Sequence, residues 1–190
     1  AFKQGLDIHA ATAAKVYGVA IDEVTRTQRS NAKAVNFGII YGQSAFGLSQ
    51  NLGISRTEAK QIIDSYFQQY PTIKSYMEEA KTKAKELGYV ETIMQRRRYL
   101  PDITSNNAIV RGYAERNAIN APIQGSAADI IKIAMIKVYQ RMQKEGVQSK
   151  MLLQVHDELV FDVLKQEEGI MRKIVKEEME SAVQLEVPMM

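Results

Sequence analysis

Helical spacing of apolar residues runs through most of the chain and then gives way to a strand-like pattern, and this change limits the fold more than any other feature. Before Gly146 the apolar positions recur every three or four residues, which is typical of amphipathic helices. Beyond it, apolar runs at 150–155 and 159–163 predict a β-hairpin around His156-Asp157-Glu158 that spans 150–163. We therefore predict an α+β fold that is mostly helical, with a small antiparallel sheet.

Residues that start and stop helices mark the expected elements. Asp7 can cap a helix that runs to Tyr17 and ends at Gly18, whereas Pro122 is expected to separate two helices. Further helices are expected at 26–41, 57–70, 71–87, 107–121, 123–144 and 166–183, the last with Ile170, Ile174 and Met179 toward a core, and a short hairpin at 89–93 and 98–100. This order predicts two lobes that meet near residue 105.

The composition excludes several kinds of protein. The 190 residues carry a formal net charge of +3 and a pI near 9.0, a weak basic bias that is compatible with nucleic-acid binding. The absence of cysteine excludes disulfides and thiolate metal sites. No apolar run reaches the roughly 18 residues of a membrane span and no signal peptide opens the chain, so we expect a cytoplasmic protein. Both ends have the character of mid-protein elements, so we expect a fragment of a longer polypeptide.

The segment RSNAKAVNFGIIYG places Arg29, Lys33, Phe37 and Tyr41 four residues apart. On an α-helix each four-residue step turns by about 400°, so these side chains form one stripe about 18 Å long. Two cations near the helix N-terminus, followed by two flat rings, suit a ligand with a polyanionic tail and a planar head, such as a nucleoside triphosphate. The alternative is a surface helix with a solvated basic end and a buried aromatic end, and spacing alone favours it.

The hairpin turn places two carboxylates, Asp157 and Glu158, at the end of two apolar strands. Carboxylates held close together repel each other, and a divalent cation with a preference for oxygen ligands, such as magnesium, removes the conflict. The apolar strands would hold the pair on a rigid support. A polar, solvent-exposed turn is the alternative for this short motif.

The segment ERNAINAPIQGSAAD places Arg116, Asn120 and Gln124 four residues apart beside a run of small residues. Amide side chains both donate and accept hydrogen bonds, which suits the degenerate acceptors of a DNA minor groove. A well-packed helix pair with a polar edge is the alternative.

Two other groups of residues are open to both a functional and a structural explanation. An arginine cluster suits phosphate contacts, or it is simply a solvated face. A histidine lies in the first predicted helix and has either a binding role or none. These residues are Arg96, Arg97, Arg98 and His9.

Together these motifs resemble the family A DNA polymerases, the bacterial DNA polymerase I type, in their order and spacing over nearly all of the chain. RSNAKAVNFGIIYG resembles the family's fingers helix, QVHDE the palm motif with the second catalytic carboxylate, and ERNAINAPIQGSAAD the intervening palm segment. The resemblance implies fingers at 1–105 and the C-terminal part of the palm at 106–190. It implies template-directed DNA synthesis in replication and repair, with primer-template DNA and dNTP as partners.

The resemblance also implies a role for each matching residue. Arg29, Lys33 and His9 would bind the triphosphate, and Lys33 is also a candidate general acid for the leaving pyrophosphate. Phe37 would stack on the incoming sugar and base, and Tyr41 would occupy the templating position until the fingers close. The DNA contacts would come from Arg96, Arg97, Arg98, Arg116, Asn120, Gln124 and His156, and the two-metal magnesium site from Asp157 with Glu158 nearby.

One part of the family pattern is missing. The family has a further metal-binding Asp in a motif like DYSQIE, and no such string occurs here. We therefore expect the isolated chain to be inactive and its palm hairpin to leave a strand edge open, which favours self-association. Two alternatives stay open: a fragment of a phage-type single-subunit RNA polymerase, against which Phe37 and Glu158 argue, and a non-catalytic nucleic-acid-binding helical module.

Overall fold

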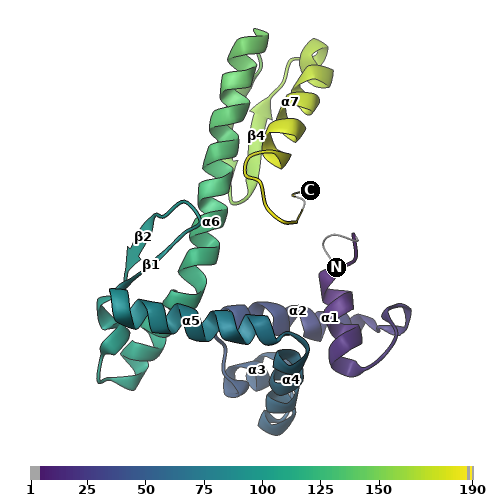
Figure 1. Ribbon diagram of the computed structural model, residues 1–190. Helices are drawn as coiled ribbons and strands as arrows, with labels where there is room; N and C mark the ends of the chain where they lie inside the picture. The colour runs from purple at the N-terminus through teal and green to yellow at the C-terminus, as the bar shows by residue number, and fades with distance from the viewer. Residues whose placement is uncertain (1–4, 188, 190) are drawn as a thin grey trace. The chain divides into compact units, whose positions relative to one another are not determined.

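Helices make up most of the molecule, and two short antiparallel sheets complete it (Figure 1). The computed structural model describes residues 5–187 and 189. In chain order the elements are α1 (Ile8–Tyr17), η2 (Ile21–Glu23), α2 (Arg26–Ile40), α3 (Ala45–Leu52), α4 (Arg56–Gln69), α5 (Pro71–Leu87), β1 (Tyr89–Glu91), β2 (Arg97–Tyr99), η3 (Pro101–Thr104), α6 (Ala108–Glu145), β3 (Lys150–Val155), β4 (Glu158–Asp162), η4 (Lys165–Glu167) and α7 (Glu168–Glu180). The predicted fold class is confirmed.

Side-chain caps fix where the first helices begin. Asp7 accepts hydrogen bonds from the backbone N–H groups of His9 and Ala10 at the start of α1. Thr25 accepts from the N–H of Gln28 at the start of α2. These N–H groups have no partner within the helix, so each cap contributes about 1 kcal/mol. Because capping is a local interaction, the sequence predicts the bounds of α1 and α2 closely.

The prediction that Pro122 separates two helices is wrong, because α6 runs unbroken through it from Ala108 to Glu145. Proline lacks the N–H that would bond to the carbonyl of Ala118, and it crowds that carbonyl. Packing offsets this local loss: Ala118 and Ala121 are buried in a cluster with residues of α5, β1 and η3. The sequence shows the proline but not the packing that keeps the helix continuous.

The hairpins form where the sequence predicts them, with changes in their bounds. β1 pairs with β2 through Tyr89 and Tyr99, and each strand is only three residues long. In the second hairpin, Glu158 pairs with Val155 as the first residue of β4, so the turn consists of His156 and Asp157 alone. The prediction that Glu158 also lies in the turn is therefore wrong.

The last helix is shorter than predicted and is rotated relative to the expected face. Ile174 is fully buried, as predicted, and Met179 packs partly buried against the same cluster. Ile170 remains 36% exposed, and Met171 takes the expected core position with 2% exposure. The prediction for Ile170 is wrong because the buried face runs through positions three apart, 171 and 174, rather than four apart.

One helix has no counterpart in the sequence-based prediction. α3 has only eight residues, too few to show a clear apolar period, although Ser44 caps it by accepting a hydrogen bond from the N–H of Gly47. Its residue Leu48 is 1% exposed and joins Val35 and Ile39 of α2 in the core. α3 therefore packs on the inner face of the helix that carries the basic and aromatic stripe.

The chain forms two compact units. The first contains the residues up to Glu91 together with Gln95–Pro122, and the second contains Thr92–Met94 together with the residues from Ile123 onward. A core of α2, α3 and α4 residues fills the first unit, and a core of α6 and α7 residues fills the second. Among the helices of the described residues, none has the length and apolarity that crossing a bilayer requires.

Candidate functional site

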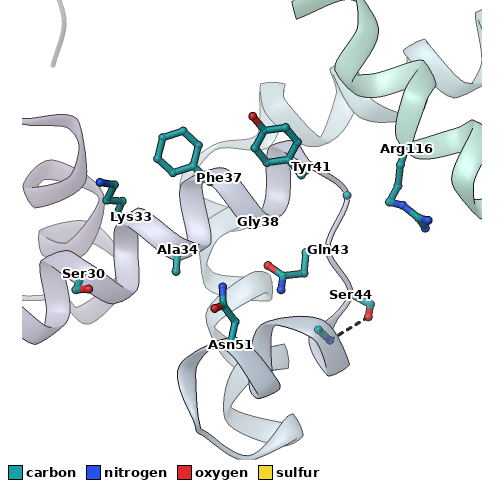
Figure 2. Close-up of a pocket in the computed structure, with 12 residues that line it drawn as sticks. Ser30, Lys33, Ala34, Phe37, Gly38, Tyr41, Gln43, Ser44, Asn51 and Arg116 are labelled. Carbon is teal, nitrogen blue, oxygen red and sulfur yellow. Dashed lines mark hydrogen bonds between the residues drawn. The ribbon is translucent and has the colours of Figure 1, made fainter. Parts of the chain in front are cut away.

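The stripe of basic and aromatic residues lies on the outer face of α2. Phe37 and Tyr41 are 47% and 46% exposed, with their rings stacked at a centroid distance of 6.5 Å and an interplanar angle of 20°. Figure 2 shows the two rings side by side, with Lys33 one turn before Phe37 on the same helix. A buried aromatic end, the structural alternative for this helix, is therefore excluded. The stripe leaves flat apolar surface open to a ligand.

The basic end of the stripe is tied to the preceding helix. Arg29 donates from Nε and Nη2 to one carboxylate oxygen of Asp7, at 2.9 and 2.7 Å. The Arg29 hydrogen bond is the first cause that lowers the pKa of Asp7 to about 2, and the Ala10 N–H adds to it. The carboxylate therefore stays ionised at neutral pH, and α1 and α2 are joined at the place where the cations gather.

His9 lies beside the stripe although it comes from α1. Its ring centroid is 5.8 Å from that of Phe37, and its Nδ1 is 3.1 Å from Nδ2 of Asn36. Burial lowers the pKa of His9, and the charges of Arg29 and Lys33 lower it further, while Asp7 opposes them. The structure thus brings His9 together with the predicted residues of α2.

A pocket of about 740 Å³ opens on the side of α2 that carries Lys33, Phe37 and Tyr41. Gln43 fills part of its wall, and its side chain lies where side chains at Gly38 and Gly47 would otherwise stand. A Cβ at position 47 would lie 2.8 Å from Cγ of Gln43, closer than real Cβ atoms come. The two glycines therefore make room for the Gln43 side chain in the wall of the pocket.

Arg116 of α6 reaches the same pocket. It packs over Gly42, where a Cβ would lie 2.8 Å from Cγ of Arg116, and Gly42 also has a φ of +67°. Glycine satisfies both demands, since it adopts positive φ freely and has no Cβ. The structure therefore joins Arg116 to the α2 stripe, although the two lie far apart in the sequence.

The other polar residues of α6 differ in exposure. Gln124 is exposed, as is Arg116, whereas Asn120 is half-buried. The Oδ1 atom of Asn120 is buried and has no hydrogen-bond partner among the described residues. Buried amide oxygens are nearly always bonded, so this atom is a candidate for an additional donor.

The hairpin turn presents its polar residues to solvent. His156, Asp157 and Glu158 are all exposed, and Gln154 donates from Nε2 to the carbonyl of His156 at 2.7 Å. His156 has a φ of +53°, a left-handed conformation that costs free energy for any residue except glycine. Two-residue hairpin turns of the favoured types need a positive φ at their first residue, so this value follows from the turn itself.

Consecutive carboxylates at Asp157 and Glu158 are oxygen ligands that a hard divalent cation accepts, so they fit part of a magnesium site. Among residues 5–187 and 189, no group of three or more His, Asp or Glu side chains comes together in a way that could hold a metal ion. The strands behind the turn are only partly packed: Leu152, Leu153 and Val155 are 42–56% exposed, whereas Met151 and Phe161 pack partly buried against the core of α6 and α7. The apolar support that the sequence suggests is therefore a two-stranded sheet that packs against a core with only part of its apolar surface.

The arginine cluster lies at the β1–β2 hairpin and is partly engaged within it. Arg97 donates to Glu91 at 2.9 Å and lies 4.5 Å from the ring centroid of Tyr89. The hydrogen bond to Glu91 is the first cause that raises the pKa of Arg97. Arg96 and Arg98 are exposed. Arg97 thus holds the hairpin together, in addition to any contact that it makes with a ligand.

Sequence reasoning missed several residues of the site. Gln43, Ser44 and Asn51 line the pocket, and Asn36 holds His9. For Asn36 a signal was present, since it is a polar residue between Val35 and Ile39 on the buried face of α2. For the pocket residues there was none, because the loop after α2 and the short α3 place them there.

Comparison with known proteins gives one consistent match. The model of DNA polymerase family A matches residues 1–190. DNA polymerase I of Streptococcus pneumoniae serotype 4 is 58% identical over 190 residues, and DNA polymerase I of Bacillus subtilis strain 168 is 53% identical over 189. Each alignment covers 100% of this chain and 22% of the relative, so the chain spans about a fifth of the length of these relatives.

A solved structure agrees with the sequence matches. The polymerase domain of Pol1 from M. smegmatis, in complex with DNA primer-template and dNTP, superposes with a TM-score of 0.96 at 46% identity. The superposition covers 100% of this chain and 33% of that one. The fold described above is therefore that of the matching third of a polymerase domain.

Proposed function

The chain belongs to DNA polymerase family A, and we propose that it forms the fingers, at 1–105, and the C-terminal part of the palm, at 106–190, of a template-directed DNA polymerase. The observation that carries the proposal is the open face of α2, with Lys33, Phe37 and Tyr41 lining one pocket. A helix that served packing alone would bury its rings, whereas these are almost half exposed. The solved relative that binds primer-template and dNTP supports the same role.

In this proposal, the α2 stripe receives the incoming dNTP. Lys33, Arg29 and His9 bind the triphosphate near the positive end of the α2 dipole, and their donors fix its orientation. Phe37 packs against the sugar and base, and Tyr41 stands at the templating position. Lys33 also transfers a proton to the pyrophosphate as it leaves, which makes it the general acid of the reaction.

The remaining residues hold the duplex and the reacting end of the primer. Arg116, Asn120 and Gln124 contact primer-template DNA from α6, where the side chains of Arg116 and Gln124 are exposed. Minor-groove acceptors are similar for all correct pairs, so these contacts test the shape of a pair rather than its sequence. The remaining DNA contacts come from Arg96, Arg97, Arg98 and His156.

Asp157 and Glu158 would hold magnesium together with a carboxylate outside this chain, and the bound metal stabilises charge on the attacking and leaving oxygens. His156 holds the primer end close to them. The reaction class is nucleotidyl transfer from dNTP to a primer 3′-hydroxyl, used in DNA replication and repair in the cytoplasm. Positioning and charge stabilisation by the residues named here carry most of the catalysis in such reactions.

Observations on this chain argue against two other functions. A phage-type RNA polymerase would carry Tyr at the position of Phe37 and would not be expected to have Glu158 after Asp157, and the match to family A over the full chain supports DNA synthesis. A non-catalytic nucleic-acid-binding module would not need the consecutive exposed carboxylates of Asp157 and Glu158, because these repel the phosphates of nucleic acid. Both observations favour the polymerase.

A graft into a complete relative tests the proposal. The matching residues of the Bacillus subtilis DNA polymerase I would be replaced by this chain, and primer extension would be measured with all four dNTPs and magnesium. We expect extension by the graft, loss of extension in the Asp157→Ala graft, and normal extension in the Asp162→Ala graft, since Asp162 lies at the far end of β4. A folded graft that binds primer-template but does not extend it, or an active Asp157→Ala graft, would contradict the proposal.

A further inference from the structure

Asn36 is the only polar residue among the buried residues of α2. Its side chain amide nitrogen lies 3.2 Å from Oγ1 of Thr12 and 3.1 Å from Nδ1 of His9, both on α1. The residue itself is 8% exposed, and Thr12 is 1% exposed. A buried amide placed between two polar groups of a neighbouring helix fixes which of them donate and which accept.

The direction of each hydrogen bond follows from the donors available. The Thr12 hydroxyl has one hydrogen, and it donates to the carbonyl of Ile8 at 2.8 Å. Oγ1 of Thr12 must therefore accept from Asn36, so the NH₂ group of the amide faces α1. The same NH₂ group faces His9, and because it can only donate, Nδ1 of His9 must accept. A neutral imidazole that accepts at Nδ1 carries its proton on Nε2.

We propose that Asn36 is a positioning residue, which holds His9 as the neutral imidazole with its proton on Nε2 and so keeps a hydrogen-bond donor available at the edge of the ring. The Nε2–H group is the only donor that His9 has left in this state. On the proposed function, on which this last step rests, it donates to a phosphate oxygen of the nucleotide. Asn36 itself does not touch the nucleotide.

Burial and charge together lower the pKa of His9, which favours a neutral ring. The groups that act on it are Asp7 at the start of α1 and Arg29 and Lys33 on α2. Burial is the largest cause of the lowered pKa of His9. Asp7, the next cause, raises the pKa, and the two cations lower it. Protonation of Nδ1 would in addition place two donors against each other, which disfavours the imidazolium further.

Long-range ¹H–¹⁵N NMR of the imidazole rings in the complete 190-residue chain tests the proposal without any nucleotide. The chain has two histidines, so a His156→Asn variant assigns the His9 signals. We expect His9 to show an unprotonated Nδ1 and a protonated Nε2 at neutral pH. A proton on Nδ1, or exchange of the proton between both nitrogens, would overturn the proposal.

An Asn36→Asp variant supplies a second measurement. The carboxylate has the same shape but only accepts, so it should draw the proton to Nδ1 and raise the pH midpoint of His9 titration by about one unit or more. The matched control is Asn31→Asp on the same helix, whose amide bonds to the hydroxyl of Tyr17 instead of His9. An equal shift in both variants would mean that general charge, rather than the Asn36 contact, sets the state of His9, and would overturn the proposal.

Addition of dNTP to the same labelled chain separates this proposal from the proposed function. If dNTP shifts the NMR signal of Nε2 of His9 while the proton stays on that nitrogen, the result supports both the proposed function and the role of Asn36. If saturating dNTP leaves the NMR signals of the His9 imidazole unchanged, the nucleotide-binding role of His9 is contradicted. The role of Asn36 in positioning His9 would then be supported by the tautomer alone.

Discussion

Arg29 of α2 and Asp7 of α1 form an ion pair in which two guanidinium nitrogens lie 2.7 and 2.9 Å from one carboxylate oxygen. The other carboxylate oxygen accepts hydrogen bonds from the backbone N–H groups of His9 and Ala10. Asp7 therefore does two things at once. It caps α1, and it binds the guanidinium of Arg29, which in the proposed function binds the triphosphate of the nucleotide.

The first prediction concerns this competition. Asparagine caps helices as well as aspartate does, so Asp7→Asn should keep α1 intact and release Arg29. In the grafted polymerase we expect the KM for dNTP to fall about two- to fivefold, in line with the small strength of exposed ion pairs. Asp22→Asn, which changes the net charge equally on exposed η2, should leave the KM unchanged. A higher KM in Asp7→Asn would mean that the pair orients Arg29 for the nucleotide.

The pH dependence of the same pair follows from the pKa of Asp7, which falls from its ordinary value of 3.8 to about 2. A lowered pKa means that the ionised carboxylate stabilises the fold. This stabilisation is fully present above 3.8 and is lost as the pH falls through about 2. The effect of Asp7→Asn on the KM should therefore be constant across the neutral range, and a dependence on pH there would assign the effect to another group.

The second prediction concerns Lys33. Loss of one charge-assisted phosphate contact should cost about 1.5–3 kcal/mol, and more in rate if Lys33 also donates a proton. In the grafted polymerase, Lys33→Ala should lower kcat/KM for dNTP by at least about tenfold while affinity for primer-template stays near normal. Lys60→Ala, an exposed lysine of α4, is the control. Equal loss of both properties in Lys33→Ala would indicate misfolding or a duplex-binding role.

The third prediction tests the contact between Phe37 and the incoming sugar. Phe37→Tyr adds a hydroxyl where a dideoxynucleotide lacks its own 3′-hydroxyl, so incorporation of dideoxynucleotides should improve relative to the normal substrates. Single-nucleotide kinetics of the graft measure this ratio. Phe46→Tyr on α3, an exposed ring outside the pocket, should leave the ratio unchanged. The same ratio in Phe37→Tyr and the parent would remove Phe37 from the site.

The fourth prediction concerns the second core. Ile174→Ala removes buried methyl groups from a side chain that is fully buried, and should lower the free energy of unfolding by about 2–5 kcal/mol. Ile170→Ala makes the same change four residues earlier, where the side chain is 36% exposed, and should cost much less. Urea denaturation followed by circular dichroism compares the two variants. Similar losses would mean that Ile170 also lies in the core.

The fifth prediction concerns the chain by itself. With carboxylates from Asp157 and Glu158 alone, two magnesium ions cannot be held about 3.5–4 Å apart, so we expect no primer extension by the purified chain. The exposed β3–β4 sheet should make the chain self-associate, and Leu153→Lys should reduce the association seen by sedimentation velocity. Leu87→Lys, an exposed leucine at the end of α5, is the control. Extension that disappears in Asp157→Ala would show a complete active site.

The sequence predicts the parts of this molecule that depend on local chemistry. Asp7 and Gly18 predict the two ends of α1 correctly, because a cap acts on the residues next to it. The four-residue spacing correctly predicts that Lys33, Phe37 and Tyr41 lie on one face, because helix geometry alone decides it. The sequence does not predict the continuity of α6 through Pro122 or the exposure of Ile170, because packing with distant residues decides both. The contact between Arg116 and Gly42 also depends on packing between distant residues, so no local sequence pattern predicts it.

The place of Gln43 between Gly38 and Gly47 has a consequence for how this site can change in evolution. A methyl group at position 38 meets the movable end of the Gln43 side chain, whereas one at position 47 meets its stem. Alanine at position 38 is therefore the more easily accepted first step, while alanine at position 47 becomes acceptable only after Gln43 has been replaced by a shorter residue. The order of change is therefore constrained for two of the three positions: a shorter residue at position 43 has to precede a side chain at position 47, whereas position 38 can change at either stage.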